Sequence, residues 1–298
     1  MVFYLNLLYF AVFAVIISFS IFFLLMSENA NAIEPKSIYF GEEINVSKNN
    51  GTSELPQVTA EGNNVYVVWQ DNSSGNYDVY FAHSPDNGEN FELIKNLSKN
   101  NGTSELPQVT AEGNNVYVVW QDNSSGNYDV YFKSSSSDGT KFKSTRNLSK
   151  NNGTSQYPKI ASNNDVFHVV WKDDRNGKQD IFSKEGRIEN LSNSIEFGSL
   201  TKLQGIGDAS KPEIFVGENF VPIIWVSNSK ISSIANIYPV SFFDDSNDAI
   251  KLTKSASKGN ILDLRISGYS INAYCVWENK DVLNGDIFFK RLSTDVID

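Results

Sequence analysis

Residues 45–81 read NVSKNNGTSELPQVTAEGNNVYVVWQDNSSGNYDVYF, and residues 96–132 repeat them with one difference, Leu97 in place of Val46. A looser third copy begins at Asn147. Tryptophans at positions 69, 120, 171, 225 and 277 continue this register along the chain, at spacings of 51, 51, 54 and 52 residues. The chain therefore holds five units of about 50 residues each, a period that is typical of propeller blades.

Each unit has the pattern of short β-strands. In the first unit we predict strands at residues 57–60, 65–69, 78–81 and 91–94, because Asn, Gly and Ser clusters separate these apolar segments. The second strand is apolar or aromatic on both faces, so both of its faces must be covered. Blades stacked around an axis provide that cover. We therefore predict an all-β fold, a five-bladed β-propeller of four-stranded blades.

The two ends of the repeat region predict how the propeller closes. The last unit stops after its third strand, at residues 286–291, and residues 37–45 (SIYFGEEIN) have the pattern of a fourth strand. We expect residues 37–44 to complete the last blade. The alternative is an open array of five hairpin pairs, which would leave sheet faces and edges bare. The predicted units are about 45–95, 96–146, 147–189, 190–250 and 251–298.

An apolar segment precedes the repeats. Residues 3–26 are apolar almost throughout, and as a helix they would span about 36 Å, enough to cross a hydrocarbon core of about 30 Å. Residues 30–32 (ANA) have the small-x-small form of a signal-peptidase site. We expect residues 1–32 to be a cleaved signal peptide or a retained N-terminal membrane anchor. Both alternatives place residues 33–298 outside the cytoplasm, secreted or held at the cell surface.

Composition excludes several classes of function. The 298 residues include 25 Lys and Arg against 35 Asp and Glu, a net charge of −10. An acidic chain with five arginines is a poor partner for nucleic acid or an anionic membrane. One cysteine excludes intrachain disulfides, and two histidines exclude a multi-histidine metal centre. Residues 71–78 hold too few carboxylates for an ordinary calcium loop, so we expect no metal and no cofactor.

A short motif indicates a known superfamily. Residues 84–91 (SPDNGENF) fit the Asp-box pattern S-x-D-x-G-x-x-[FW] between the third and fourth predicted strands, and residues 136–142 resemble a box one residue short. With the repeated strand segments, residues 37–298 resemble the sialidase-superfamily (BNR repeat) propellers of microbial cell surfaces. The resemblance implies that Ser84, Asp86, Gly88 and Phe91 are structural, with the aspartate fastening the turn and the aromatic ring packing beneath the blade.

The arginines depart from the sialidase pattern. Catalytic sialidases clamp the substrate carboxylate with three arginines, whose planar groups bind it bidentately, and the first of them lies near the start of the propeller. This chain has no arginine before Arg146. Only Arg175 and Arg265 are placed to face a shared cleft. We therefore predict a sialidase-like propeller without the catalytic arginine pattern.

Acidic residues in the loops after the tryptophans are the candidate ligand-binding residues, together with Arg175: they are Asp71, Asp122, Asp173 and Glu278. One interpretation is glycoside hydrolysis, as in five-bladed furanosidases, which needs one protonated and one ionised carboxyl group. The first two units present identical residues here, which favours repetition over a division of roles. Turn-capping carboxylates are the structural alternative.

We therefore expect an exported, non-catalytic propeller for recognition or adhesion, with surface glycans or other surface proteins as partners. The alternative is a glycoside hydrolase of sialidase-like or furanosidase type that uses loop carboxylates. Residues 195–208 form an insertion that is either a lid or neutral surface, and we expect His83 to be exposed and both His168 and Cys275 to be packed. Nine sequons are glycosylation candidates: Asn45, Asn50, Asn72, Asn96, Asn101, Asn123, Asn147, Asn152 and Asn190.

Overall fold

The computed structural model describes residues 41–189, 194–203, 208–218, 220–228, 233–241, 250–252, 260–280 and 285–293. The expected signal or anchor segment and residues 37–40 of the expected closing strand lie outside these ranges. None of the described segments forms a helix long and apolar enough to cross a membrane. Residues 41–45 are described and form no strand.

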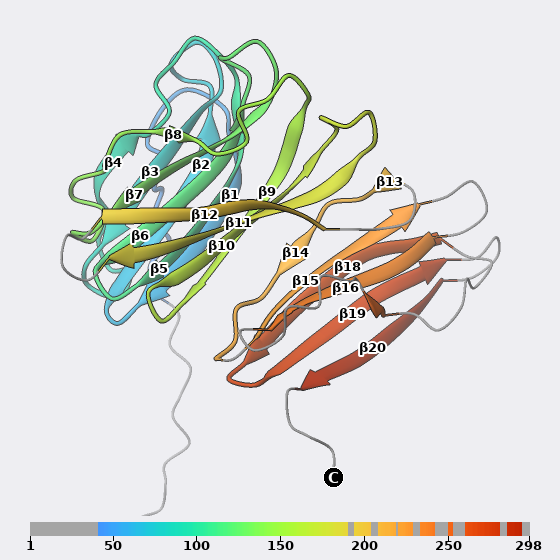
Figure 1. Cartoon of the computed structure of the whole chain (residues 1–298). Coiled ribbons are helices and arrows are strands. Elements are labelled where there is room, and N and C mark those ends of the chain that lie inside the picture. The colour runs from blue at the N-terminus through green and yellow to red at the C-terminus, as the bar shows by residue number, and fades with distance from the viewer. Residues whose placement is uncertain are drawn as a thin grey trace, which may run out of the picture. The chain divides into compact units, whose positions relative to one another are not determined.

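The first two sheets are near copies of each other (Figure 1). Sheet 1 contains β1 (Ser53–Glu61), β2 (Asn64–Asp71), β3 (Asp78–Ser84) and β4 (Glu92–Asn96). Sheet 2 contains β5 (Ser104–Glu112), β6 (Asn115–Asp122), β7 (Asp129–Ser135) and β8 (Arg146–Asn147). In both sheets the strands follow chain order and every neighbouring pair is antiparallel. The predicted strand order of the first two units is therefore confirmed.

The remaining sheets repeat the same antiparallel plan with differences at their edges. Sheet 3 contains β9 (Ser155–Asn163), β10 (Val166–Asp173), β11 (Asp180–Glu189) and β12 (Ser194–Leu203). Sheet 4 contains β13 (Asp208–Ala209), β14 (Glu213–Ile214), β15 (Phe220–Asn228), β16 (Ser233–Ser241) and β17 (Ile250–Lys251). Sheet 5 contains β18 (Asn260–Tyr269), β19 (Asn272–Lys280) and β20 (Gly285–Ser293). The described residues are thus all β, in five successive sheets.

Most of the expected insertion at 195–208 is a paired strand rather than an overhanging loop. Residues 194–203 are β12, which pairs with β11 along its length, so sheet 3 continues past the predicted unit boundary at 189. Lys202 pairs with Phe182 as Asn96 pairs with Tyr80 in sheet 1. The sequence Asn190-Leu191-Ser192 matches that of residues 96–98, but the strand pairing does not align the two segments. Lys202-Leu203 corresponds to Asn96-Leu97.

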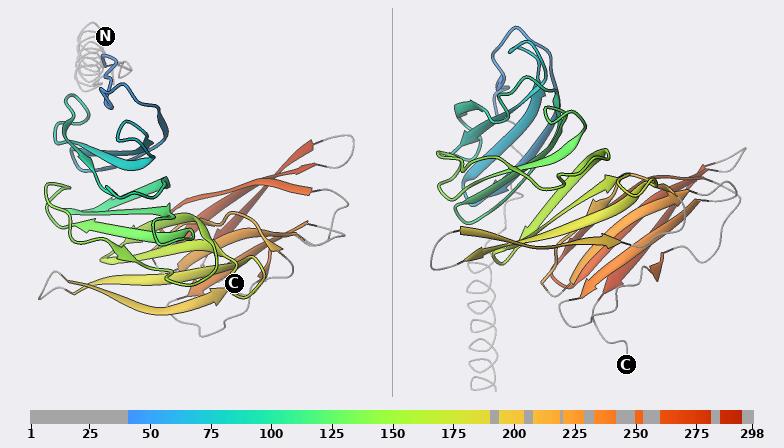
Figure 2. Two further views of the ribbon diagram at one scale, coloured as in Figure 1. Left: turned by 90° about the horizontal axis from the view of Figure 1, so that it is seen from above. Right: turned by 45° about the horizontal axis from the view of Figure 1, so that its top comes forward.

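The sheets pack face to face in chain order, as both views of Figure 2 show. We call the face of a sheet that meets the next sheet its forward face and the opposite face its rear face. Between sheets 1 and 2, forward residues Tyr66, Val68 and Phe81 pack against rear residues Val118 and Trp120 in one buried cluster. Equivalent clusters join sheets 2 and 3, 3 and 4, and 4 and 5. The prediction that the second strand of each unit is covered on both faces is therefore confirmed for sheets 2 to 4.

Candidate functional site

The carboxylate that follows each of the first three tryptophans is buried and hydrogen-bonded inside its own sheet. Asp122 accepts bonds from Trp120 Nε1 at 3.2 Å and from Ser104 Oγ at 2.6 Å, both on Oδ2. It also accepts bonds from Asn100 Nδ2 at 2.6 Å and from the Ser124 amide at 2.8 Å. The same set of contacts holds Asp71 and recurs, with Arg175 added, at Asp173.

These bonds keep the three carboxyl groups ionised. Burial by itself raises the pKa of Asp71, but hydrogen bonds from Ser53, Ser73 and Asn49 outweigh it and lower the pKa to about 2. The pKa values of Asp122 and Asp173 are lowered by the same balance. Each carboxylate is at most 1% exposed. A ligand would therefore have to displace the sheet's own donors to reach any of them.

Arg175 and Asp173 are brought together, whereas Asp71 and Asp122 stay apart in sheets 1 and 2. Arg175 donates from Nε to Asp173 Oδ1 at 2.9 Å and from Nη2 to Oδ2 at 2.6 Å. Its guanidinium also lies 4.4 Å from the ring centroid of Phe182. Arg175 lines a shallow hollow with Lys150 and Asp174, and it does not line the cavity that contains Arg265. The expectation that these two arginines share a cleft is wrong.

Glu278 does not occupy the position of the buried aspartates. In sheet 1 Asp71 pairs with Asp78, and in sheet 5 the residue that pairs with Asp286 is Asn279. Glu278 is therefore the counterpart of Gln70, one residue earlier on the strand. Counting residues from the tryptophan would have revealed this shift.

Residues 84–91, which resemble an Asp-box, hold the turn between β3 and β4. Asp86 Oδ1 accepts bonds from Ser84 Oγ at 2.7 Å and from the Asn90 amide at 2.9 Å, which lower the pKa of Asp86 to about 2. The Gly88 amide donates to Ser84 Oγ at 2.9 Å, and Gly88 has a φ of 88°, a conformation that favours glycine. Phe91 is half-buried. Hydrogen bonds within this segment therefore hold the hairpin turn in place.

The sequons occupy three kinds of environment. Asn96 and Asn147 each donate their amide nitrogen to a buried aspartate, at 2.6 and 2.7 Å, so the atom that would carry a glycan is engaged. Asn72 and Asn123 accept bonds from the backbone through their side-chain oxygens, at 2.8 Å each. The exposed asparagines are Asn45, Asn50, Asn101 and Asn152. Asn190 lies outside the described residues.

The two histidines and the cysteine pack inside the fold. His168 is 3% exposed, in the place that Tyr66 has in sheet 1, and burial lowers its pKa. Burial raises the pKa of Cys275 to about 11. His83 is also buried and contacts Asn64 Oδ1 at 2.7 Å, so the expectation that it is exposed is wrong. Among the described residues no cluster of three or more His, Cys, Asp or Glu side chains could hold a metal ion.

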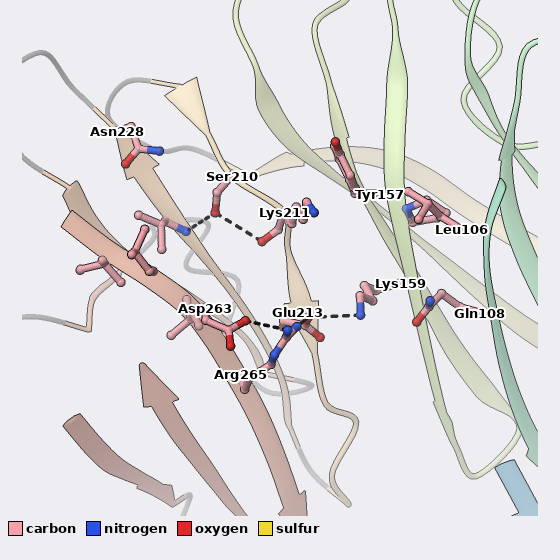
Figure 3. A pocket seen from close by; sticks show the side chains of 15 residues that line it. Leu106, Gln108, Tyr157, Lys159, Ser210, Lys211, Glu213, Asn228, Asp263 and Arg265 are labelled. Atoms are coloured by element: carbon pink, nitrogen blue, oxygen red, sulfur yellow. Dashed lines mark hydrogen bonds and ion pairs between the residues drawn. The ribbon is translucent and has the colours of Figure 1, made fainter. Parts of the chain in front are cut away.

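A cavity of about 480 Å³ lies among the first strands of sheets 2 to 5 (Figure 3). Eight of its 15 lining residues share a feature that the sequence analysis missed: in units 2 to 5 they flank the proline, or Leu264 in its place. They are Leu106 and Gln108, Tyr157 and Lys159, Lys211 and Glu213, and Asp263 and Arg265. The regular prolines gave the signal, but nothing in the pattern showed which neighbours point inward.

A backbone irregularity positions the residue before the proline. Leu106, Tyr157 and Asp263 have φ values of 53°, 56° and 45°, in the left-handed region that bulky residues rarely adopt. The pairing register shifts at each of these positions, as it does in a β-bulge. Leu55 in sheet 1 has the same conformation, with φ 52°. Each bulge therefore turns a side chain out of the hydrogen-bonded ladder. Strained backbone of this kind often marks a functional site.

The cavity carries charges of both signs at one point. Glu213 Oε1 accepts from Arg265 Nη1 at 2.7 Å and lies 3.2 Å from Lys159 Nζ, while Arg265 Nη2 lies 2.6 Å from Asp263 Oδ1. Lys211 lies against the face of Tyr157, with Nζ 4.6 Å from the ring centroid. Figure 3 shows Arg265 between the two carboxylates, with Lys159 on the opposite wall. Three cationic and two acidic groups therefore meet in this cavity of an acidic chain.

Comparison with known proteins gives matches in structure alone. No known protein family matches the sequence, and no curated protein matches it. The chain is similar to a Coprinopsis cinerea GH62 α-L-arabinofuranosidase catalytic domain, at 14% identity and TM-score 0.42, over 85% of this chain and 93% of that one. It is also similar to a thermostable family-43 glycoside hydrolase at 13% identity and TM-score 0.43, over 83% of this chain and 91% of that one.

A third structure that it resembles is an endo-arabinase from Bacteroides thetaiotaomicron, at 9% identity and TM-score 0.46, over 80% of this chain and 94% of that one. All three are glycoside hydrolases, the class that the sequence analysis gives as its alternative. At these identities and TM-scores the likeness carries no argument about activity. The resemblance to sialidase-superfamily propellers rests on the sequence motifs alone, and no family match supports it.

Proposed function

We propose that this protein binds an acidic saccharide in the cavity lined by Lys159, Lys211 and Arg265, and that it acts in recognition rather than catalysis. The observation that carries the proposal is the convergence of these three cations, from three successive sheets, in a chain of net charge −10. A carboxylate on the ligand would pair with the guanidinium and the two ammonium groups. Gln108 and Asn228 line the same cavity with amide side chains, a group that can bond sugar hydroxyls.

The arrangement of acids supports a non-catalytic role. The carboxylates of Asp71, Asp122 and Asp173 are closed within their own sheets. In the cavity, Glu213 and Asp263 both pair with the same guanidinium. Glycoside hydrolysis needs one carboxyl group that holds a proton and another that is ionised, whereas here both carboxylates are engaged in ion pairs.

Glycoside hydrolysis is the second candidate, and one observation favours it. Glu213 and Asp263 line a single cavity from neighbouring sheets, as the paired carboxylates of such enzymes do. In this case Arg265 would have to leave one of the two acids when the sugar binds. Turnover would then be lost on substitution of either carboxylate.

The proposed setting is outside the cell, at the surface or in the medium. It is supported by the apolar segment at residues 3–26 and by the sequon-rich sequence. Surface glycans are the proposed partners.

The test is titration of the purified chain with glucuronate- and galacturonate-containing oligosaccharides and with their neutral counterparts. We expect binding of the acidic sugars alone and a loss of at least about tenfold in affinity in Lys159→Gln, Lys211→Gln and Arg265→Gln, since each removes a charge-assisted contact. Arg187→Gln is the control, because Arg187 is exposed and pairs with Glu185 outside the cavity. Equal binding of neutral and acidic sugars would refute the proposal.

The same preparation separates the two candidates. Release of reducing sugar by the parent chain, absent in Glu213→Gln and Asp263→Asn, would establish the hydrolase. Binding without turnover in all three proteins would establish the recognition function.

A further inference from the structure

Sheet 5 exposes a forward face that every other sheet buries. Tyr274, Val276, Ile287 and Phe289 are 40%, 39%, 76% and 64% exposed. Their counterparts in sheet 1 are completely buried against sheet 2: they are Tyr66, Val68, Val79 and Phe81. The rings of Tyr274 and Phe289 stack at 6.1 Å, as those of Tyr66 and Phe81 do. Sheet 5 therefore carries the forward half of a sheet–sheet interface.

Sheet 1 exposes the matching rear half. Val58 is 67% exposed, while its counterparts Val109, Ile160, Ile214 and Ile266 each pack against the core shared with the preceding sheet. Val65 and Val67 of sheet 1 are partly buried, whereas Val116 and Val118 of sheet 2 are completely buried. The rear face of sheet 1 thus matches the forward face of sheet 5, in the way that the rear face of each later sheet matches the forward face of the sheet before it.

A polar contact of the repeat is also unmade at the same place. Asp78 accepts bonds from Asn96 Nδ2 at 2.6 Å and from Ser98 Oγ at 2.9 Å, so the Asn-x-Ser segment that begins at the end of β4 is bonded to β3. Asn147 and Ser149 hold Asp129 at 2.7 Å each. Asp286 is the counterpart of these aspartates in sheet 5 and is exposed. The donors with the corresponding sequence are Asn45 and Ser47.

A second polar contact joins neighbouring sheets across the bulges. Gln70 Oε1 accepts from the Leu106 amide at 3.1 Å, and Gln121 Oε1 accepts from the Tyr157 amide at 3.1 Å. Glu278 holds the place of Gln70 in sheet 5, so its carboxylate is the matching acceptor for the Leu55 amide.

We propose that the forward face of sheet 5 packs on the rear face of sheet 1, with Asn45 and Ser47 bonded to Asp286. The five sheets then form a closed five-bladed propeller. Closure brings Leu55 and Gln57 to the cavity that their four counterpart pairs line. The contact is within one chain, because covalent linkage gives the two faces an effective concentration that a second copy at ordinary concentration does not reach.

A disulfide tests the proposed register directly. Tyr80 pairs with Asn96 in sheet 1, so Phe288 should pair with Asn45. Directly paired antiparallel residues have Cα atoms about 4.5–5.5 Å apart, within the range of a disulfide. In a Cys275→Ala background, the test variant carries Asn45→Cys and Phe288→Cys, and the positive control carries Tyr80→Cys and Asn96→Cys.

We expect both double variants of the full chain to form an intramolecular disulfide, seen as a monomer with no free thiol. Two outcomes would overturn the proposal. The control could form its bond while the test pair stays reduced, or the test pair could form disulfides only between chains, as a head-to-tail assembly of copies would.

A single substitution provides a second measurement that does not need a bond. Ile287→Cys in the same background should react with a thiol reagent roughly 100-fold more slowly than Ser74→Cys, an exposed reference, since a buried thiol reacts only on local opening. Val79→Cys, at the buried counterpart, sets the rate expected for a closed interface. Reaction of Ile287→Cys at the rate of Ser74→Cys would contradict closure. Closure can fail while the ligand still binds Lys159, Lys211 and Arg265, so the two proposals are tested separately.

Discussion

The substitution Asp122→Ala separates a structural carboxylate from a ligand-binding one. Asp122 is 0% exposed, and the donors Trp120 Nε1 and Ser104 Oγ that point at it are on residues that are also 0% exposed. Removing the carboxylate leaves both donors without this acceptor in a place that water does not reach. A buried donor without a partner costs about 1–3 kcal/mol. We therefore expect the free energy of unfolding to fall by about 3–4 kcal/mol.

The assay is urea unfolding followed by tryptophan fluorescence, because the affected indole lies in the site. Asp122→Ser is the matched variant, since sheet 4 already uses this arrangement: Trp225 Nε1 donates to Ser227 Oγ at 3.2 Å. It should recover part of the lost stability. Glu92→Ala, at an exposed position, should change stability by less than about 0.5 kcal/mol.

A ligand-binding role for Asp122 makes the opposite prediction. Functional carboxylates are commonly held at a cost to stability, so their removal changes stability little or raises it. If Asp122→Ala unfolds within about 1 kcal/mol of the parent chain and binds saccharide more weakly, the structural interpretation is refuted.

Two further predictions concern the core. His168 has a pKa below its value of about 6.5 in the unfolded chain because it is buried, so the folded state binds its proton less readily and stability falls as the pH drops below about 6.5. One such group contributes a slope of at most about 1.4 kcal/mol per pH unit, and the charges that face His168 are Glu185, at 3.9 Å, and Arg187. Urea midpoints between pH 7 and 5 should therefore depend less on pH in His168→Tyr than in the parent chain. An unchanged slope would contradict this account. In Gly186→Ala the new Cβ would lie 2.1 Å from the Phe167 ring, and we expect a loss of about 1–3 kcal/mol from overpacking. Gly198→Ala is its control, because the nearest atoms there are 3.9 Å away, and equal melting temperatures for the two variants would show that the ring moves aside.

The sequence repeat predicts the sheets because its apolar segments are the strands that form the buried cores. A strand buried on both faces needs apolar residues at every position, and the segment around each tryptophan has them. The role of Asp122 was also within reach of the sequence. Residues two apart on a strand lie on the same face, so a tryptophan followed by x-Asp predicts the indole–carboxylate contact that sheets 1 to 3 show. The interpretation that places these aspartates in loops overlooked the two-residue spacing from the tryptophan.

Two features were beyond the sequence for physical reasons. Asn190-Leu191-Ser192 has the same sequence as residues 96–98. Only the pairing of Lys202 with Phe182 shows that the position equivalent to Asn96 lies twelve residues later, at Lys202. The cavity depends on left-handed backbone at residues such as Leu106 and Tyr157. Local sequence disfavours that conformation, and the surrounding ladder imposes it. A pattern of residue types therefore cannot show which side chains a bulge turns inward.

The proposed preference for an acidic ligand depends on the charged residues of the divergent units. The near-identical units 1 and 2 have Leu and Gln at the positions that flank the proline, whereas units 3 to 5 have Lys159, Lys211 with Glu213, and Asp263 with Arg265. The neutral Leu and Gln pairs of units 1 and 2 add no charge, so the charge at the cavity comes from the three divergent units. Exchanging Gln108 for Lys should therefore strengthen binding of an acidic sugar, because it adds a cation to the same wall. The same exchange at Gln57 has this effect only if sheet 1 meets sheet 5. Binding affinity in Gln57→Lys thus reports on ligand charge and ring closure together, and Gln108→Lys alone reports on charge.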